Sequence, residues 1–315
     1  CGLHSLRVSG ARNFSRQIVT PARRGRRVLF NVPGSDERKL NKVKKLDLDV
    51  AVFDLEDGVA PNRKEEARKM ITHHLQTVQD YPKHMEKSIR MNAVDSSLEH
   101  DDMRQCILPS LPFLDSVLIP KVEFPNQLRY VAWHIAKALQ QTPRAEPFEL
   151  IAAIESAKGI LNLADLCNTE LPPQVKLTGL VYASEDLCAD MGLTRTPSRM
   201  ELLYTRQKLV CTAKAFGLDA IDLVCIDFKD DEVLYNEALE GHQMGFTGKQ
   251  AIHPNQIASI YKAFAPAPEK VEFARKIVEG FDKHSSEGKG AFEVDGKMID
   301  MPMLKWAHGV LRMVE

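Results

Sequence analysis

Short apolar runs alternate along this chain with longer segments in which apolar residues recur every three to four positions. The first pattern is typical of strands buried on both faces of a sheet, and the second of amphipathic helices. We expect strands at residues 27–32, 50–54, 88–91, 116–120, 149–154, 177–182, 220–224 and 248–252. Helices are expected between them, at residues 37–46, 62–75, 126–139, 158–167, 200–216, 233–244 and 254–264, and once more at residues 269–285.

This alternation predicts βαβ units and therefore a parallel sheet. Eight units favour an α/β fold of the closed (β/α)8 or TIM-barrel type, which needs roughly 250 of the 315 residues. An open doubly wound sheet is the alternative, but no G-x-G-x-x-G follows the first strand to support its dinucleotide-binding form. We expect the barrel at residues 28–266. Residues 267–315 are expected to form a C-terminal helical extension that acts as a lid or as an arm packed on a neighbouring subunit.

Charged residues follow five of the expected strands. They are Asp54, Glu56 and Asp57 after the second strand, then Arg90, Lys121, Glu155 and the pair Glu185–Asp186 after the four that follow. The carboxyl ends of parallel barrel strands meet at one face, where such enzymes keep their chemistry, so we expect these side chains to surround one site. Two cations and several carboxylates together indicate an anionic substrate that is bound with a divalent metal.

Glu155 and Asp186 are the candidate metal ligands. Their strands are consecutive, so their ends should be adjacent. One or two carboxylates that leave positions open for water and substrate oxygens suit Mg²⁺. Two alternatives stay open at this point. Glu155 can instead be a first-turn residue that interacts favourably with a helix dipole, and Glu185 can replace Asp186 as the ligand.

Arg90 and Lys121 are the candidate partners for negative charge. An Arg at a barrel mouth binds a carboxylate through two parallel hydrogen bonds or stabilises a developing oxyanion. The alternative for Arg90 is an ion pair with Asp54, Glu56 or Asp57, and the two roles are compatible. A lysine in such a place can form a Schiff base, but for Lys121 we favour ion pairs with the surrounding acids.

Two further places are candidates for phosphate binding. Arg38 and Lys42 lie one turn apart on the first expected helix, close to its N-terminus, where anions bind favourably. The backbone at Ala251 and Ile252 ends the eighth strand, where barrels frequently hold phosphate. The alternative for the cations is a helix face that is merely solvated, and the adjacent His253 is interpreted as structural.

Composition argues against two classes of protein. The chain holds 42 basic and 43 acidic residues, which is not the basic excess of a nucleic-acid binder. No apolar stretch approaches the roughly 18 residues needed to cross a membrane. We therefore expect neither a nucleic-acid nor a membrane partner. Six scattered cysteines without a C-x-x-C pair indicate free thiols in a reducing compartment.

The first 27 residues contain seven arginines, several serines and no Asp or Glu. This composition is typical of a mitochondrial transit peptide. We interpret residues 1–27 as the remnant of one, which predicts a location in the mitochondrial matrix. A disordered basic tail or a cloning remnant is the alternative.

Ten strings, in chain order, resemble the citrate lyase β-subunit-like family, which includes malyl-CoA and citramalyl-CoA lyases. They are VPGSD, VAVFDLEDGVA, IRMN, LIPKVE, IAAIESAKGILN, YASEDLCADMG, RQKLVCTAKAFGLDAIDLV, GFTGKQAIHPNQI, FAPAPEK and MIDMP. Together they span nearly everything between residues 27 and 302. The long GFTGKQAIHPNQI and the KGAF…MIDMP segment are most similar to the citramalyl-CoA lyases of animal mitochondria.

The resemblance implies a (β/α)8 barrel that binds Mg²⁺ and assembles as a homotrimer. The matched positions are Glu155 and Asp186 for the metal, Arg90 for the substrate, Arg38 and Lys42 for coenzyme A, and Asn31 for a contact on the coenzyme A side. Asp300 in MIDMP, which the strand pattern does not identify, matches an acid that a neighbouring subunit supplies to the active site. Asn31 departs from the family, which more often has an aromatic residue there, and Ser184 stands where Gly is usual.

The implied reaction is the reversible, Mg²⁺-dependent cleavage of citramalyl-CoA to acetyl-CoA and pyruvate, with Arg90 and Asp300 as catalytic residues. A CoA thioester and a small 2-oxo acid are then the partners. One alternative is malate synthase or malyl-CoA thioesterase chemistry, on glyoxylate and acetyl-CoA, as the main activity. The other is a non-catalytic CoA-binding protein.

Overall fold

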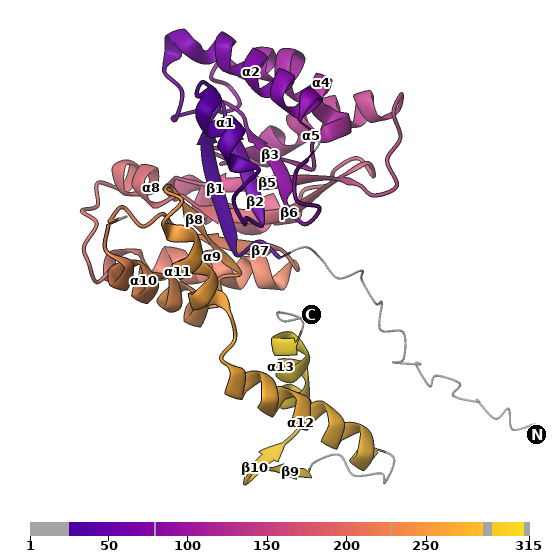
Figure 1. The fold of residues 1–315 in the computed structure, drawn as a ribbon, viewed down its shortest axis with the longest axis vertical. Helices are drawn as coiled ribbons and strands as arrows, with labels where there is room; N and C mark the ends of the chain where they lie inside the picture. Colours follow the sequence, from indigo (N-terminus) through magenta and orange to yellow (C-terminus); the bar gives the residue numbers. More distant parts are fainter. Residues whose placement is uncertain (1–24, 79, 228, 286–291, 312–315) are drawn as a thin grey trace, which may run out of the picture.

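A closed barrel of eight parallel strands forms the body of the protein (Figure 1). The computed structural model describes residues 25–78, 80–227, 229–285 and 292–311. The strands are β1 (Val28–Pro33), β2 (Val50–Asp54), β3 (Glu86–Arg90), β4 (Ser116–Ile119), β5 (Phe148–Ile154), β6 (Val175–Tyr182), β7 (Asp219–Asp222) and β8 (Gly248–Ala251). Because β1 pairs with both β2 and β8, the predicted TIM barrel is confirmed and the open sheet is wrong.

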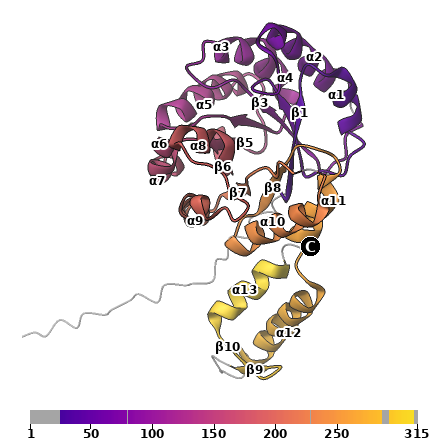
Figure 2. The same cartoon turned by 90° about the vertical axis from the view of Figure 1, so that its left-hand side faces the viewer.

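Helices surround the barrel wall (Figure 2). The longer ones and those that follow strands directly are α1 (Glu37–Val43), α2 (Lys64–Thr77), α5 (Pro125–Leu139), α6 (Ala157–Leu161), α7 (Leu163–Cys167), α8 (Ser184–Met191), α9 (Leu203–Ala215), α10 (Asp231–Met244) and α11 (Gln256–Phe264). Single turns, η1 (Pro61–Arg63) and η4 (Met200–Leu202), precede α2 and α9. Within the described ranges, no helix combines the length and the apolar character that crossing a bilayer requires.

The sequence pattern missed the helices between β3 and β4. Residues 99–113 form four short pieces, α3 (Glu99–Asp102), the π-turn η2 (Met103–Ile107), α4 (Leu108–Ser110) and η3 (Leu111–Phe113). Pro109 and Pro112 lack the N–H that a continuous helix would need, so the segment breaks into turns. The pattern also joined α6 and α7 into one helix and did not predict α8.

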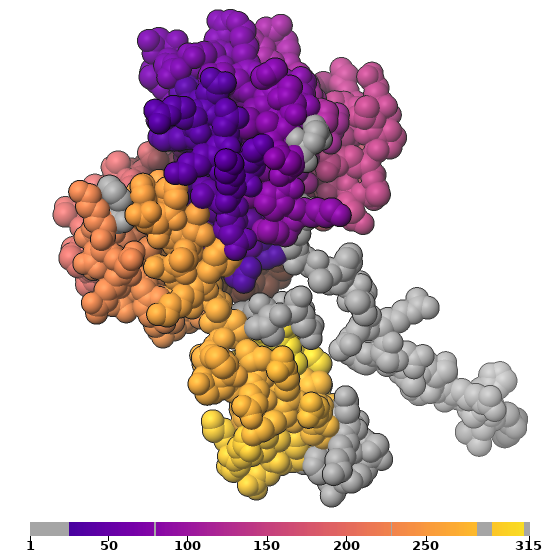
Figure 3. All heavy atoms as spheres, in the orientation of Figure 1, coloured from indigo at the N-terminus to yellow at the C-terminus, as the bar shows by residue number. Residues whose placement is uncertain are grey.

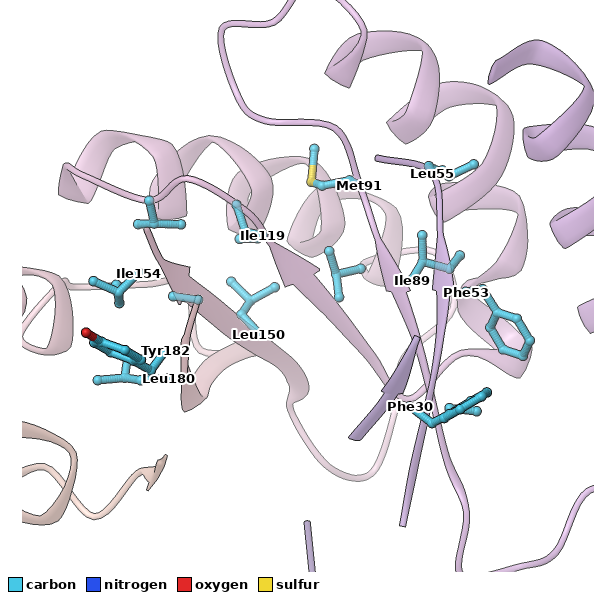
Figure 4. Close-up of a cluster of buried hydrophobic side chains, with 14 of the residues drawn as sticks. Phe30, Phe53, Leu55, Ile89, Met91, Ile119, Leu150, Ile154, Leu180 and Tyr182 are labelled. Carbon is cyan, nitrogen blue, oxygen red and sulfur yellow. The ribbon is translucent and has the colours of Figure 1, made fainter. Parts of the chain in front are cut away.

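Alternate residues of each strand face opposite sides of the wall. Phe53, Ile89, Leu150 and Tyr182 belong to the set that packs against the helices and forms the main core (Figure 4). A separate apolar layer fills the barrel interior and consists of Leu29, Val50, Val52, Leu118, Ile151, Ala153, Val181 and Ile221. The interior is therefore solid below the carboxyl ends of the strands, which leaves those ends to form the site.

Arg26 closes the amino end of the barrel. Its side chain is 2% exposed, and its guanidinium contacts Glu86 at 2.7 Å and Glu149 at 2.5 Å. Thr178 and Asp219 accept further hydrogen bonds at 2.9 and 3.3 Å. Arg26 belongs to the basic segment of residues 1–27 that we interpret as a transit-peptide remnant, but its contacts are with the barrel. The transit-peptide interpretation otherwise concerns residues 1–24, which lie outside the described residues.

The C-terminal module (residues 268–311) consists of α12 (Pro268–Ser285), the antiparallel strands β9 (Phe292–Val294) and β10 (Lys297–Ile299), and α13 (Met301–Leu311). It projects from the barrel beyond α11 as a separate lobe (Figures 1 and 3). Its own apolar core contains Val271, Ala274, Ile277, Phe292, Ile299, Leu304, Ala307 and Val310. This separate core supports treating the extension as a unit distinct from the barrel, and its role as a lid or arm stays a prediction.

Replacing Arg26 should destabilise the barrel strongly. Arg26→Met leaves the buried Glu86 carboxylate without its charge partner, and the expected loss is about 3–5 kcal/mol of unfolding free energy. Arg27→Met is the matched control. Arg27 is 38% exposed, and its partner Asp49 keeps hydrogen bonds from the backbone of Arg27 and Val28. Urea unfolding measures both variants, and equal losses would contradict the role given to Arg26.

Candidate active site

A cavity of about 560 Å³ opens at the carboxyl ends of the strands. It is lined by residues in or just after β1, β2, β3, β6, β7 and β8 and by one face of α1. These residues include Asn31, Lys39, Lys42, Asp54, Arg90, Ser184, Glu185, Asp186, Val224, Gln250, Ile252 and His253. Five of the predicted site residues, Asn31, Lys42, Arg90, Asp186 and Ile252, therefore surround one space. Of the charged residues that follow the strands, Asp54, Arg90, Glu185 and Asp186 line this cavity, whereas Glu56, Asp57, Lys121 and Glu155 are not among its lining residues.

Arg90 is held by Asp54 through two parallel hydrogen bonds. Its Nε and one terminal nitrogen each lie 2.7 Å from a different oxygen of Asp54, which is 1% exposed. The same two oxygens accept the backbone N–H groups of Glu56 and Gly58 at 2.8 Å. A third guanidinium nitrogen lies 3.2 Å from Glu56 in an ion pair without hydrogen-bond alignment. The predicted ion pairs are confirmed, and Arg90 still borders the cavity.

Glycines allow the chain to fold tightly around this ion pair. A Cβ atom at Gly58 would lie 2.3 Å from Asp54 Oδ2, and one at Gly34 would lie 2.7 Å from the Asp54 carbonyl oxygen. Both distances are shorter than any real Cβ contact, so larger residues would displace Asp54. The D-L-E-D-G turn after β2 thus sets the position of Arg90 on the neighbouring strand.

Lys121 pairs with the acids of the same turn. Its Nζ lies 2.5 Å from Glu56 Oε1 and 3.5 Å from Asp57. Partial burial disfavours its charge, but the hydrogen bond and charge of Glu56 outweigh that effect and raise the pKa of Lys121. A protonated amine is not a nucleophile, so the structure favours the predicted pairing role over a Schiff base.

Glu155 and Asp186 form a pair of neighbouring carboxylates. Glu155 follows β5 and is 5% exposed, and Asp186 lies in the first turn of α8. Burial raises the pKa of Glu155 to about 8, and the charge of Glu56 and the hydrogen bond and charge of Asp186 act in the same direction. A hydrogen bond from the Lys121 backbone opposes the shift only in part. Negative charge at this point is poorly compensated by the protein itself.

The neighbouring Glu185 is engaged elsewhere. The guanidinium of Arg195 donates a short hydrogen bond to it, and Ser184 donates another at 3.0 Å. The structure therefore favours Asp186 over Glu185 as the partner of Glu155, a choice that sequence spacing left open. Ser184 adopts ordinary helical backbone geometry at the start of α8, so no glycine is needed there.

The carboxylate pair fits a hard divalent cation. Among the described residues, no group of three or more His, Cys, Asp or Glu side chains is arranged to hold a metal ion. Mg²⁺ commonly uses one or two carboxylates and takes its other ligands from water and substrate. A cation beside Glu155 and Asp186 would also neutralise the charge that raises the pKa of Glu155.

Cations of α1 lie along the outer part of the cavity. Lys39 and Lys42, three residues apart, line it, whereas Arg38 is exposed and is not one of its lining residues. Ala251 is fully buried beneath Ile252, which does line the cavity, as does His253. The roles of Arg38 and Ala251 in coenzyme A binding stay predictions, and Lys39 joins the candidates.

Two amide side chains complete the inner part of the cavity, and sequence reasoning missed one of them. Asn31 Oδ1 is buried without a hydrogen-bond partner among the described residues, which leaves an acceptor ready for a ligand. Gln250 donates to the carbonyl of Tyr182 at 3.1 Å and borders the same space. β8 has the sequence Gly-Lys-Gln-Ala and is fully buried, so a polar residue near the carboxyl end of a buried strand was the available signal for Gln250.

Asp300 is separated from the cavity of its own chain. It lies between β10 and α13 in the C-terminal module, and it is not one of the residues that line the cavity. Its carboxylate accepts a hydrogen bond from the Met303 backbone at 3.1 Å, and its carbonyl accepts one from Leu304. Asp300 therefore caps α13. A test of a chemical role for Asp300 therefore has to distinguish that role from the loss of this cap.

The chain is similar to several known proteins. The family model described as HpcH/HpaI aldolase/citrate lyase matches residues 26–254. The mitochondrial citramalyl-CoA lyase of Homo sapiens is 43% identical over 290 residues, which cover 91% of this chain and 84% of that protein. The (3S)-malyl-CoA thioesterase of Cereibacter sphaeroides is 34% identical over 275 residues, covering 87% and 89% of the two chains.

A solved structure shares the fold. Protein CitE from Mycobacterium tuberculosis, in complex with magnesium, acetoacetate and coenzyme A, has a TM-score of 0.72 and 28% sequence identity. The match covers 92% of this chain and 99% of that chain.

Asp54 should be far more important for stability than Asp57, three residues later in the same turn. Asp54→Asn places an NH2 group opposite the donors of Arg90 and the backbone and breaks a buried ion pair, so about 3–5 kcal/mol should be lost. Asp57 is 60% exposed, and Asp57→Asn should cost less than about 1 kcal/mol. Chemical denaturation distinguishes them, and a mild effect of Asp54→Asn would contradict the importance of the ion pair.

Proposed function

Because the chain belongs to the HpcH/HpaI aldolase/citrate lyase family and is a carbon–carbon lyase, we propose that it cleaves citramalyl-CoA reversibly to acetyl-CoA and pyruvate with Mg²⁺ as cofactor. The observation that carries this proposal is the uncompensated Glu155–Asp186 pair at the same strand ends as Arg90. The identity with the human citramalyl-CoA lyase supports the choice of substrate.

In the proposed site Glu155 and Asp186 hold the cation. A bound Mg²⁺ would supply Lewis-acid polarisation of the hydroxyl, carboxylate and ketone oxygens of the pyruvate half. Arg90 lines the cavity while Asp54 fixes the plane of its guanidinium. Such a preoriented cation stabilises negative charge that develops on the thioester oxygen during the reaction.

The reaction requires a proton donor at the enolate carbon. When the hydroxyl of citramalyl-CoA loses its proton, its electrons form the ketone of pyruvate, and the C–C bond electrons pass into the enolate of acetyl-CoA. The enolate carbon then takes up a proton, so the proton lost and the proton gained balance. Asp300 of a neighbouring subunit would deliver that proton, and in the condensation direction it would remove it.

The coenzyme A part of the substrate would lie along α1. Lys39 and Lys42 line the outer part of the cavity, where they can bind the phosphate groups. Asn31, farther inside, offers an acceptor for a hydrogen-bond donor of the ligand. The complex of CitE with coenzyme A supports coenzyme A as the ligand of this cavity.

Assembly and location are part of the proposal. A homotrimer would bring the C-terminal module of one subunit to the cavity of the next, which accounts for Asp300 lying outside its own cavity. The mitochondrial location of the human relative supports the same location, in the matrix, for this chain.

Malyl-CoA thioesterase or malate synthase activity is the second candidate. The similarity to the (3S)-malyl-CoA thioesterase favours it. Pyruvate and glyoxylate differ by one methyl group, and an apolar pocket discriminates such a difference by only about 1–3 kcal/mol. Both reactions would use the same cavity.

The main activity can be decided by assaying citramalyl-CoA with and without Mg²⁺. We expect acetyl-CoA and pyruvate to appear together only when the cation is present, and kcat/KM for citramalyl-CoA to exceed that for glyoxylate plus acetyl-CoA. A higher value for the glyoxylate reaction would favour the second candidate. If the chain showed neither turnover nor coenzyme A binding, both candidate functions would be contradicted.

The chemical role of Asp300 should be separable from its cap. Asp300→Asn keeps an oxygen that caps α13 but cannot transfer the proton, so turnover should fall by at least about 100-fold with little change in thermal stability. Asp300→Ala should lose the same turnover and, in addition, about 1 kcal/mol of stability. Near wild-type turnover of Asp300→Asn would contradict the assignment.

A mixture of two inactive variants tests whether subunits share a site. Glu155→Gln removes a proposed metal ligand, and Asp300→Asn removes the proposed acid. When the variants are unfolded and refolded together in equal amounts, about a quarter of the sites should contain both intact residues and recover activity. No recovery would mean that Glu155 and Asp300 do not act in one site contributed by two subunits.

A further inference from the structure

We propose that Arg195 is a positioning residue that withholds Glu185 from the cation site and thereby keeps the site selective for Mg²⁺ over Ca²⁺. This inference rests on the proposed function, because it assumes that Glu155 and Asp186 bind the cation. Arg195 is not one of the charged residues that directly follow the strands.

Arg195 binds three neighbouring parts of the barrel mouth. One terminal nitrogen contacts Glu185 in the first turn of α8. The other donates to the carbonyl of Val224, beyond β7, at 2.9 Å and lies 3.2 Å from Glu237 on α10. The Arg195 side chain is 11% exposed, whereas that of Glu185 is 52% exposed. The largely buried guanidinium of Arg195 thus holds the more exposed carboxylate of Glu185.

The position of Glu185 makes this contact important. Glu185 lines the cavity and precedes Asp186 directly in the chain. Without Arg195, a third carboxylate that lines the same cavity would be free to turn towards the proposed cation. Mg²⁺ prefers a small octahedral shell that retains several waters, whereas Ca²⁺ accepts six to eight oxygens in flexible geometry. An additional mobile carboxylate therefore benefits Ca²⁺ more than Mg²⁺.

Arg199 provides a matched control within the same charge cluster. It lies 3.2 Å from Glu237, as Arg195 does, and it also contacts Glu240. Its side chain is 12% exposed, close to the value for Arg195, but its ion pairs are with Glu237 and Glu240 rather than Glu185. Glu237 keeps Lys249 at 2.8 Å in either variant. A purely structural role in neutralising Glu237 would thus give similar results for the two arginines.

The experiment measures cation binding rather than activity. Isothermal titration calorimetry with MgCl2 and with CaCl2 gives the Kd of the metal-free full chain for wild type, Arg195→Gln, Arg199→Gln and the double variant Arg195→Gln/Glu185→Gln. We expect Arg195→Gln to bind Ca²⁺ about tenfold more tightly while its Kd for Mg²⁺ changes less than about threefold. Arg199→Gln and the double variant should keep the wild-type ratio of the two constants.

Each outcome bears on a different claim. An unchanged ratio of Kd values in Arg195→Gln, with Mg²⁺ bound by the wild type, would overturn the role of Arg195 alone. A changed ratio that persists in the double variant would show that Glu185 is not the residue responsible and would overturn it as well. A wild-type chain that binds neither cation would contradict the proposed metal site and this inference together. Thermal unfolding of all four proteins identifies any variant that is unfolded, and Arg195→Met, which keeps an apolar stem for packing but no charge, then replaces Arg195→Gln.

Discussion

The ion pair between Arg90 and Asp54 determines how the barrel mouth is built. Burying either charge alone would cost several kcal/mol, so each is tolerated only because the other is present in good geometry. Asp54 additionally accepts two backbone N–H groups of the turn that follows it. One carboxylate thus fixes the end of β3 and the turn after β2 relative to each other, and Glu56 extends the arrangement to Lys121, which follows β4.

Against this background the Glu155–Asp186 pair is unusual. Most acids described at the mouth have a cationic partner, but Glu155 faces the carboxylates of Asp186 and Glu56. Like charges in a poorly solvated place reduce stability, and such residues concentrate where a protein binds a ligand that supplies the missing charge. The arginines and lysines around them are held by other acids, as in the contacts of Lys121 with Glu56 and of Arg195 with Glu185. At the barrel mouth, acids that are paired with arginine or lysine therefore surround a central carboxylate pair that forms no ion pair among the described residues.

The barrel and its charged strand ends could be predicted from the sequence because strand burial and strand order are local properties of the pattern. The residues of a helix that face the cavity could not be predicted, because they depend on how the helix is rotated about its axis. Arg38 and Lys42 are one turn apart, but α1 presents Lys39 and Lys42 to the cavity. Arg195 escaped prediction because its partners lie 10, 29 and 42 residues away and no periodicity connects them. Asp300 was reached by family resemblance alone, since its proposed site belongs to another copy of the chain.

Arg26 has a consequence for how much of the N-terminus can be cut away. Proteolysis that stops before it leaves every contact described for the barrel intact. A cut that removed Arg26 would strip the charge partner from Glu86 and Glu149 inside the amino end of the barrel. A truncation that keeps the barrel stable therefore has to end before Arg26, and this limit is set by an internal ion pair of the folded chain.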